Sequence, residues 1–163
     1  MNSAKGKTKM RTQKGNATTE LPVAMLVLLL LIFLPMLDIV AIVAKYGMCY
    51  SLNLLQTNEA ALLPSSKATA PSGPIKNEIP KNWKASGMGQ FVDLEGSPDT
   101  NVTYQGGADT TQDQFVTVKT KFVLKPFISN SATFLPAVPG LNAPVTFTLE
   151  NTRPLENPSN AKK

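Results

Sequence analysis

One apolar run near the N-terminus constrains this chain more than any other feature. No charged residue occurs from Leu21 to Leu37, and after Asp38 the run continues from Ile39 to Ala44. A helix of about two dozen residues can cross a hydrocarbon core of roughly 30 Å. The sequence therefore predicts a transmembrane segment over residues 21–44. In a chain of 163 residues, this leaves room for one modest domain.

The excess positive charge lies in front of this run. Five of the 16 basic residues occur in the first fifteen positions, without an acid among them. They are Lys5, Lys7, Lys9, Arg11 and Lys14. The other 11 basic residues balance the 11 acidic ones, so the basic pI does not indicate a nucleic-acid partner. Because basic flanks remain cytoplasmic, we expect a cytoplasmic N-terminus and a C-terminal domain on the opposite side of the membrane.

Residues 16–62 are predicted to form one long N-terminal helix that extends beyond the membrane. Past Lys45, apolar residues recur at helical spacing, which indicates an amphipathic continuation. They are Met48, Leu52, Leu55 and Leu62. Pro64 is expected to end the helix, because the residue before a proline disfavours helical geometry. Residues 63–84 contain four prolines and are predicted to form a Pro-rich linker.

Residues 85–153 are predicted to form an exterior β domain, and residues 154–163 a polar tail. Four segments have strand character: Gln90–Leu94, Asn101–Gln105, Phe115–Leu124 and Val145–Glu150. In the clearest of them, Lys119 and Lys121 mark the solvent-exposed face, so the alternate residues should face the core. So short a β region needs a second layer, and the emerging helix can supply it. The predicted fold class is α+β: a long N-terminal transmembrane helix followed by a small antiparallel β-sheet domain.

The residues that introduce the apolar run form a distinctive pattern. Gly15 follows the basic leader of residues 1–15, Asn16 begins the next segment, and Glu20 stands directly before Leu21. A carboxylate is costly in a bilayer, so an acid at this place suggests a specific partner. Without such a partner, Gly15 would be a flexible glycine, and Glu20 an acid favoured by the positive end of the helix dipole.

The pattern resembles the processing and assembly signature of type IV prepilins. More narrowly, the chain resembles the TadE-like pseudopilins, minor pilins of the tight-adherence (Tad, or Flp) pilus family. The motifs that carry this resemblance are Thr19-Glu20-Leu21, Leu34-Pro35, Asp38-Ile39-Val40, Asn53 to Ala61, the strand Phe115–Phe127, the segment Leu135–Leu141 and the final strand Val145–Glu150. Pro22 and Leu21 depart from the pattern of the major Flp pilins, where a tyrosine often stands beside the acid; this favours a minor subunit.

The resemblance implies a function in assembly. A prepilin peptidase would cleave between Gly15 and Asn16, and Glu20 would neutralise the new N-terminal amine of its own chain or of a neighbour. The implied partners are that peptidase, other pilin-like subunits, the inner-membrane assembly platform and membrane lipid. The implied location is the bacterial inner membrane, as a single-pass protein with a periplasmic C-terminal domain that can enter a surface pilus or a secretion apparatus.

Other interpretations of the same residues remain open. The chain could be a permanently signal-anchored membrane protein whose exterior β domain binds a partner, with Glu20 incidental. Pro35 should kink or locally unwind the span, and Asp38 could pack against a neighbouring helix or lie at the membrane interface. Cys49 could form an intermolecular disulfide or remain a reduced packing residue. With no histidine and no clustered ligands, we expect no catalytic site, metal or cofactor, and no enzyme.

Overall fold

The protein has an α+β fold in which a long apolar helix precedes a small three-stranded antiparallel sheet. The computed structural model describes residues 17–106, 114–126, 137–140 and 143–156. The chain divides into two units, residues 1–35 and residues 36–163. The predicted fold class is confirmed at this level.

The first unit is helical throughout its described part. It contains α1 (Ala17–Leu28) and the π-helix η1 (Leu29–Phe33), and it ends just after the beginning of α2 (Leu34–Leu62). The helical stretch Leu21–Leu62, of 42 residues, is long and apolar enough to cross a membrane.

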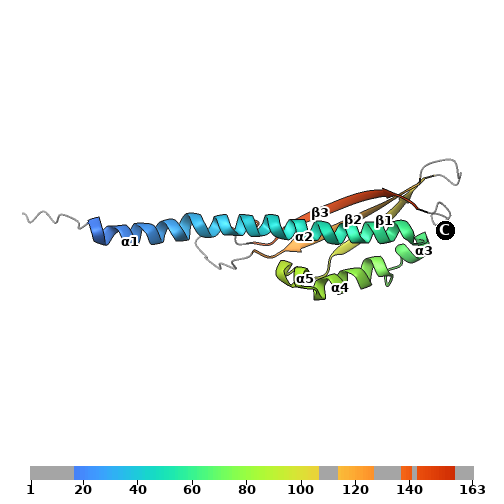
Figure 1. The fold of residues 1–163 in the computed structure, drawn as a ribbon, viewed down its shortest axis with the longest axis horizontal. Helices are drawn as coiled ribbons and strands as arrows, with labels where there is room; N and C mark the ends of the chain where they lie inside the picture. The colour runs from blue at the N-terminus through green and yellow to red at the C-terminus, as the bar shows by residue number, and fades with distance from the viewer. Residues whose placement is uncertain (1–16, 107–113, 127–136, 141–142, 157–163) are drawn as a thin grey trace, which may run out of the picture. The chain divides into compact units, whose positions relative to one another are not determined.

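The second unit contains the sheet, drawn with its covering helices in Figure 1. Its strands β1 (Asp99–Gln105), β2 (Phe115–Leu124) and β3 (Val145–Pro154) are antiparallel in the order β1-β2-β3. The register places Val118 opposite Val102 on one side and opposite Asn151 on the other. Three predicted strands therefore exist, and the alternation in β2 is as expected: Val116, Val118, Thr120, Phe122 and Leu124 are all buried.

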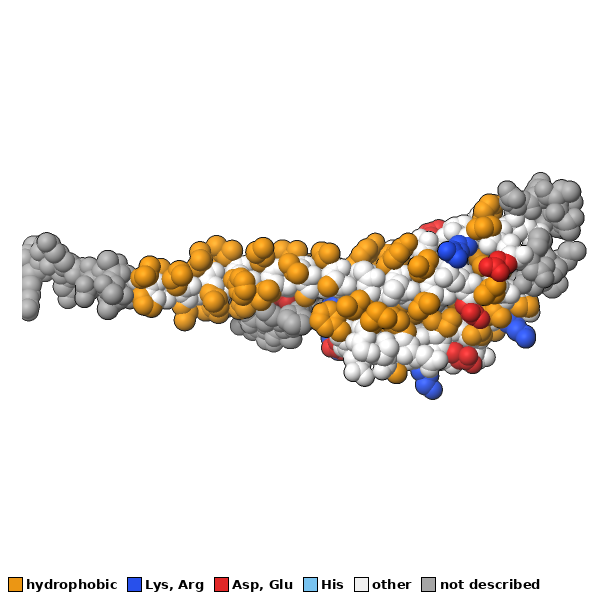
Figure 2. Space-filling model, viewed as in Figure 1, with side chains coloured by type: hydrophobic (Ala, Val, Ile, Leu, Met, Phe, Trp, Pro, Cys, Tyr) orange, Lys and Arg blue, Asp and Glu red, His pale blue; other side chains and the backbone are white. Residues whose placement is uncertain are grey.

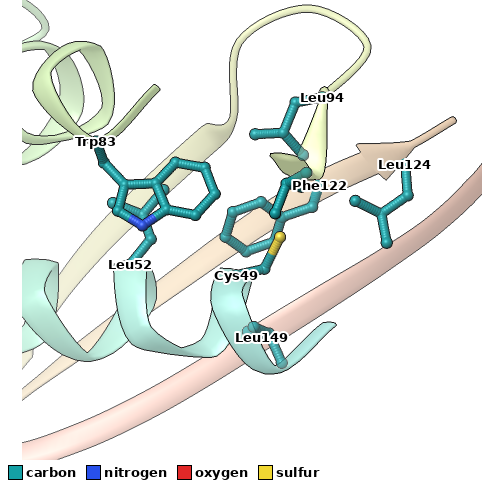
Figure 3. Close-up of a cluster of buried hydrophobic side chains, with 8 residues drawn as sticks. Cys49, Leu52, Trp83, Leu94, Phe122, Leu124 and Leu149 are labelled. Atoms are coloured by element: carbon teal, nitrogen blue, oxygen red, sulfur yellow. The ribbon is translucent and has the colours of Figure 1, made fainter. Parts of the chain in front are cut away.

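One face of the sheet packs against helices, and two apolar clusters fill the space between. The first cluster joins α2, the short helices and the Leu124 end of β2, as Figure 3 shows. Its buried members are Cys49, Leu52, Trp83, Val92, Leu94, Phe122, Leu124 and Leu149. The second cluster lies toward the end of α2, where Ala60 and Ala61 face Val116 and Val118. The domain is thus two-layered, as its apolar sheet face requires.

The region predicted as a linker is instead part of this helical layer. It contains α3 (Ser65–Ala68), the π-helix η2 (Pro74–Glu78) and α4 (Ile79–Ala85). Its prolines do not keep it extended, because Pro74 begins η2, where a missing N–H costs nothing, and the helical backbone continues through Pro80 into α4. Buried Ile75 and Trp83 fix the segment to the core.

The predicted strand Gln90–Leu94 is also wrong. Its first three residues form the second half of α5 (Gly87–Val92), and Leu94 makes an isolated bridge to Leu124. The side chain of Ser86 caps this helix by accepting a hydrogen bond from the Gly89 N–H. Asp93 ends it in the left-handed conformation, with φ of 48°. The Ser86 cap and the left-handed Asp93 therefore favour a helix here, although the apolar residues alternate weakly as in a strand.

Candidate functional site

The residues predicted to carry processing and assembly lie around the start of α1. Gly15 and Asn16 are outside the described residues, whereas Glu20 belongs to the first turn of α1. An acid in a first turn is stabilised by the helix dipole, whether or not the chain is cleaved before it. The position of Glu20 is therefore compatible with both interpretations of this acid.

The helix that follows presents an apolar surface on every side. Its large side chains between Leu21 and Phe33 are 50–71 % exposed. The orange side chains along this helix in Figure 2 show how continuous the apolar surface is. Such a surface exceeds what a soluble monomer exposes to water, so it needs lipid or other apolar helices around it.

Pro35 lies just beyond a local change in the helix. Over Leu29–Phe33 the helix is a π-helix, and the N–H of Leu34 donates to the carbonyl of Leu29, five residues back. Proline lacks an N–H and its ring crowds the carbonyl four residues earlier, which here belongs to Leu31. A wider turn before the proline relieves this conflict while keeping the chain helical.

Asp38 is buried within the second unit, where it is only 4 % exposed. Lys45, two turns later on α2, is 2 % exposed, and its Nζ donates a hydrogen bond to the carbonyl of Lys125 at 3.0 Å. Burial lowers the pKa of Lys45, and the negative charges of Asp93 and Asp38 oppose this shift. The acid that the sequence suggested for packing or interfacial placement is therefore already buried within its own chain.

The strongest polar arrangement is a buried ladder between α2 and the sheet. We use "polar ladder" for Asn53, Gln56, Thr57, Thr100 and Thr120, which are all buried. Asn53 Nδ2 donates to the carbonyl of Val118 at 3.2 Å and to Thr120 Oγ1 at 3.1 Å. The amide of Gln56 donates to Thr100 Oγ1 at 3.0 Å and accepts from Thr120 Oγ1 at 2.9 Å.

Sequence reasoning missed this ladder because it considered only the apolar residues of the helix. Of the predicted stripe, Leu52 and Met48 pack in the first cluster, whereas Leu55 and Leu62 are 50 % and 51 % exposed. Leu52 is fully buried, and beside it the ladder residues Asn53, Gln56 and Thr57 face the sheet. Their spacing of three and four residues was the available signal, but polar residues at that spacing usually indicate a solvated face.

Cys49 is a packing residue of the first cluster. Its side chain is fully buried, and Figure 3 shows its sulfur among the labelled apolar side chains. Burial raises the pKa of the thiol to about 12, so the reactive thiolate is scarce at neutral pH. Of the two interpretations of Cys49, the structure supports the reduced packing residue.

Beside α4 lies a shallow cavity of about 400 Å³ with a basic lining. It is lined by Lys76, Asn77, Pro80, Lys81, Lys84, Ala85, Ser97 and Pro98. Lys84 Nζ is already bonded to the carbonyl of Gly96 at 3.0 Å. Among the described residues, no group of three His, Cys, Asp or Glu side chains is placed to hold a metal ion.

Comparisons with known proteins do not add a relative to this description. No protein-family model matches the chain, and neither a curated protein nor a solved structure matches it.

Proposed function

We propose that the chain is a minor pilin or pseudopilin, processed by a prepilin peptidase and assembled into a Tad/Flp-type pilus or a related secretion apparatus. Cleavage would follow Gly15 and leave Asn16 as the first residue of the mature subunit. Glu20 would then be its fifth residue. The partners would be other pilin-like subunits and the assembly platform of the bacterial inner membrane.

The observation that carries this proposal is the order of features along one helix. A basic leader ends in Gly15, an acid follows at Glu20, and an apolar helix of membrane-spanning length begins immediately after it. The apolar surface from Leu21 to Phe33 suits either of two environments, lipid before assembly and apolar helices of other subunits after it. A subunit that moves from a membrane into a filament needs a surface compatible with both.

Glu20 has a physical role in such a transfer. Removal of residues 1–15 eliminates five positive charges and creates a new N-terminal amine five residues before the apolar run. At a membrane surface, the amine and the Glu20 carboxylate would each lower the cost of desolvating the other. An uncleaved chain has no amine at this position, so Glu20 would then be only a dipole partner.

Intact mass of the protein purified from membranes of its native host tests processing. We expect a chain that begins at Asn16 and has lost the leader. Gly15→Leu should keep the leader and remain in the membrane, because a bulky side chain obstructs the backbone at the cleavage site. Gly6→Leu is the matched control within the same leader and should be processed normally. A full-length wild-type chain in cells with an active prepilin peptidase would instead identify a permanently anchored protein.

Assembly is tested separately with Glu20→Gln. This variant should be inserted but should be lost from sheared pilus or pseudopilus fractions, because the amide cannot neutralise the amine. Glu78→Gln, at an exposed position of η2, is the control and should assemble like the wild type. Recovery of Glu20→Gln in those fractions at the wild-type level would remove the proposed assembly role of this acid.

A further inference from the structure

The apolar run of the sequence does not end where the domain begins. The predicted segment 21–44 is longer than the about 20 residues that a hydrocarbon core requires, so a helix that enters the core at Leu21 leaves it near Val40. Yet the second unit begins at Met36, Asp38 is buried, and Ile42 packs against the first cluster. Part of the domain must therefore lie close to the level at which α2 leaves the hydrocarbon.

The part that reaches this level is a turn that precedes β3 and contains Val138, Gly140 and Ala143. The N–H of Ala143 donates to the carbonyl of Val138 at 3.3 Å, and the N–H of Gly140 donates to the carbonyl of Ala143 at 2.7 Å. Gly140 has φ of 87°, and a Cβ there would lie 2.6 Å from Ile42 Cδ1. The positive φ favours glycine here, and the short distance shows that the turn lies directly against the side chain of Ile42.

Among the described residues of this turn, the exposed side chains are apolar. Val138 is 40 % exposed, and Ala137 and Pro139 are exposed beside it. On α2, one turn after Ile42, Tyr46 is 46 % exposed and its ring packs on Phe147 with centroids 5.0 Å apart. An amphipathic tyrosine beside small apolar residues is typical of the layer between lipid headgroups and acyl chains.

Two exposed apolar side chains of α5 lie toward the same end of the sheet. They belong to Met88 and Phe91, and α5 leads into the bridge between Leu94 and Leu124. Other exposed apolar side chains of the domain lie elsewhere, among them Leu55 and Leu62 on α2 and Phe115 at the opposite end of β2.

We infer that the turn around Val138 and Pro139, together with Tyr46, contacts the phospholipid surface of the membrane in which the helix is anchored. Ile42 lies about 3 Å beyond Val40 along the helix axis, and headgroup layers are roughly 5–8 Å thick. A turn held against Ile42 therefore lies at headgroup depth. This contact would give the domain a defined position on the bilayer before any partner binds it. The inference rests on the membrane anchorage in the proposed function, but not on leader cleavage or pilus assembly.

Spin labelling of the full chain in phosphatidylethanolamine–phosphatidylglycerol vesicles tests this contact. Single cysteines are introduced by Val138→Cys, Phe115→Cys and Leu26→Cys, while buried Cys49 stays and the unsubstituted chain serves as the labelling blank. Phe115 is the matched control, because it is 36 % exposed against 40 % for Val138 but lies at the far end of the sheet. Each nitroxide is then measured for its relative accessibility to oxygen and to a water-soluble nickel complex.

The expected result is a several-fold higher oxygen-to-nickel ratio at 138 than at 115, with the highest ratio at 26. Equal ratios at 138 and 115, with a high ratio at 26, would overturn the lipid contact and leave the anchor intact. A low ratio at 26 would remove the anchor, and the inference with it. Spin–spin broadening at 138 that grows with the protein-to-lipid ratio would assign this surface to a second copy of the chain instead. Intact mass of the same samples reports on leader cleavage independently.

Discussion

At the scale of single residues, Cys49 illustrates how burial decides chemistry. Its thiol is fully buried and its pKa is raised to about 12. We expect no labelling of the native chain by a maleimide at pH 8, and complete labelling after denaturation, because the thiolate is the reactive form. Ser66→Cys, at an exposed position of α3, should react in the native state. Rapid native labelling of Cys49, measured by intact mass, would contradict this packing.

Asn53 joins α2 to two strands of the sheet, since its amide donates to the carbonyls of Val118 and Leu149. Asn53→Ala removes the donor to the carbonyl of Val118 and to Thr120 Oγ1, although Thr120 Oγ1 keeps its bond to Gln56. We expect a loss of about 1–3 kcal/mol in the free energy of unfolding, because two buried hydrogen bonds between α2 and β2 are lost. Urea denaturation of the full chain in detergent micelles, followed by the fluorescence of buried Trp83, measures it. The exposed Asn82→Ala on α4 should change stability by less than about 0.5 kcal/mol.

At the scale of elements, the orientation of α2 on the sheet gives a direct comparison. Leu52 is fully buried in the first cluster, whereas Leu55 is 50 % exposed. Leu52→Ala should cost about 2–5 kcal/mol of unfolding free energy, because it leaves a cavity in a packed core. Leu55→Ala should stay within about 0.5 kcal/mol. The same denaturation measurement ranks the two, and the reverse order would show that α2 turns Leu55, rather than Leu52, toward the sheet.

The elements that sequence reasoning located are those with a strong period. In β2, the five buried core residues occupy every second position, and Lys119 and Lys121 lie on the opposite face of the strand. Only this orientation of the strand buries all five. By contrast, α5 depends on the cap at Ser86, and α4 on a proline placed at its start. The spacing of apolar residues carries no information about helix caps or about prolines at helix starts. The polar ladder was missed for a related reason, since buried amides are paired only through strands distant in sequence.

At the scale of the whole molecule, two weak acids of raised pKa, buried Cys49 and half-buried Tyr104, predict how stability depends on pH. Burial raises the pKa of the Tyr104 phenol, like that of Cys49, to about 12, from ordinary values of 10.0 and 9.0. Above pH 9 the unfolded chain loses these protons first, so the folded chain binds more protons and the free energy of unfolding falls as pH rises. The fall should reach at most about 1.4 kcal/mol per pH unit for each group. Denaturation at pH 8 to 11 measures it, and Cys49→Ala should flatten the curve.

Charge along the chain predicts the orientation of the molecule. The five basic residues before the apolar run favour a cytoplasmic N-terminus, which directs the domain to the opposite side of the membrane. A membrane-impermeant maleimide added to spheroplasts should label Ser66→Cys in the domain, but Ser3→Cys in the leader only after lysis. The Ser3→Cys chain also carries Gly15→Leu, so that the leader is retained if a peptidase acts. If Ser3→Cys were labelled in intact spheroplasts and Ser66→Cys were not, the orientation would be the reverse of the expected one. The domain would then lie in the cytoplasm, where a filament subunit of this kind could not assemble.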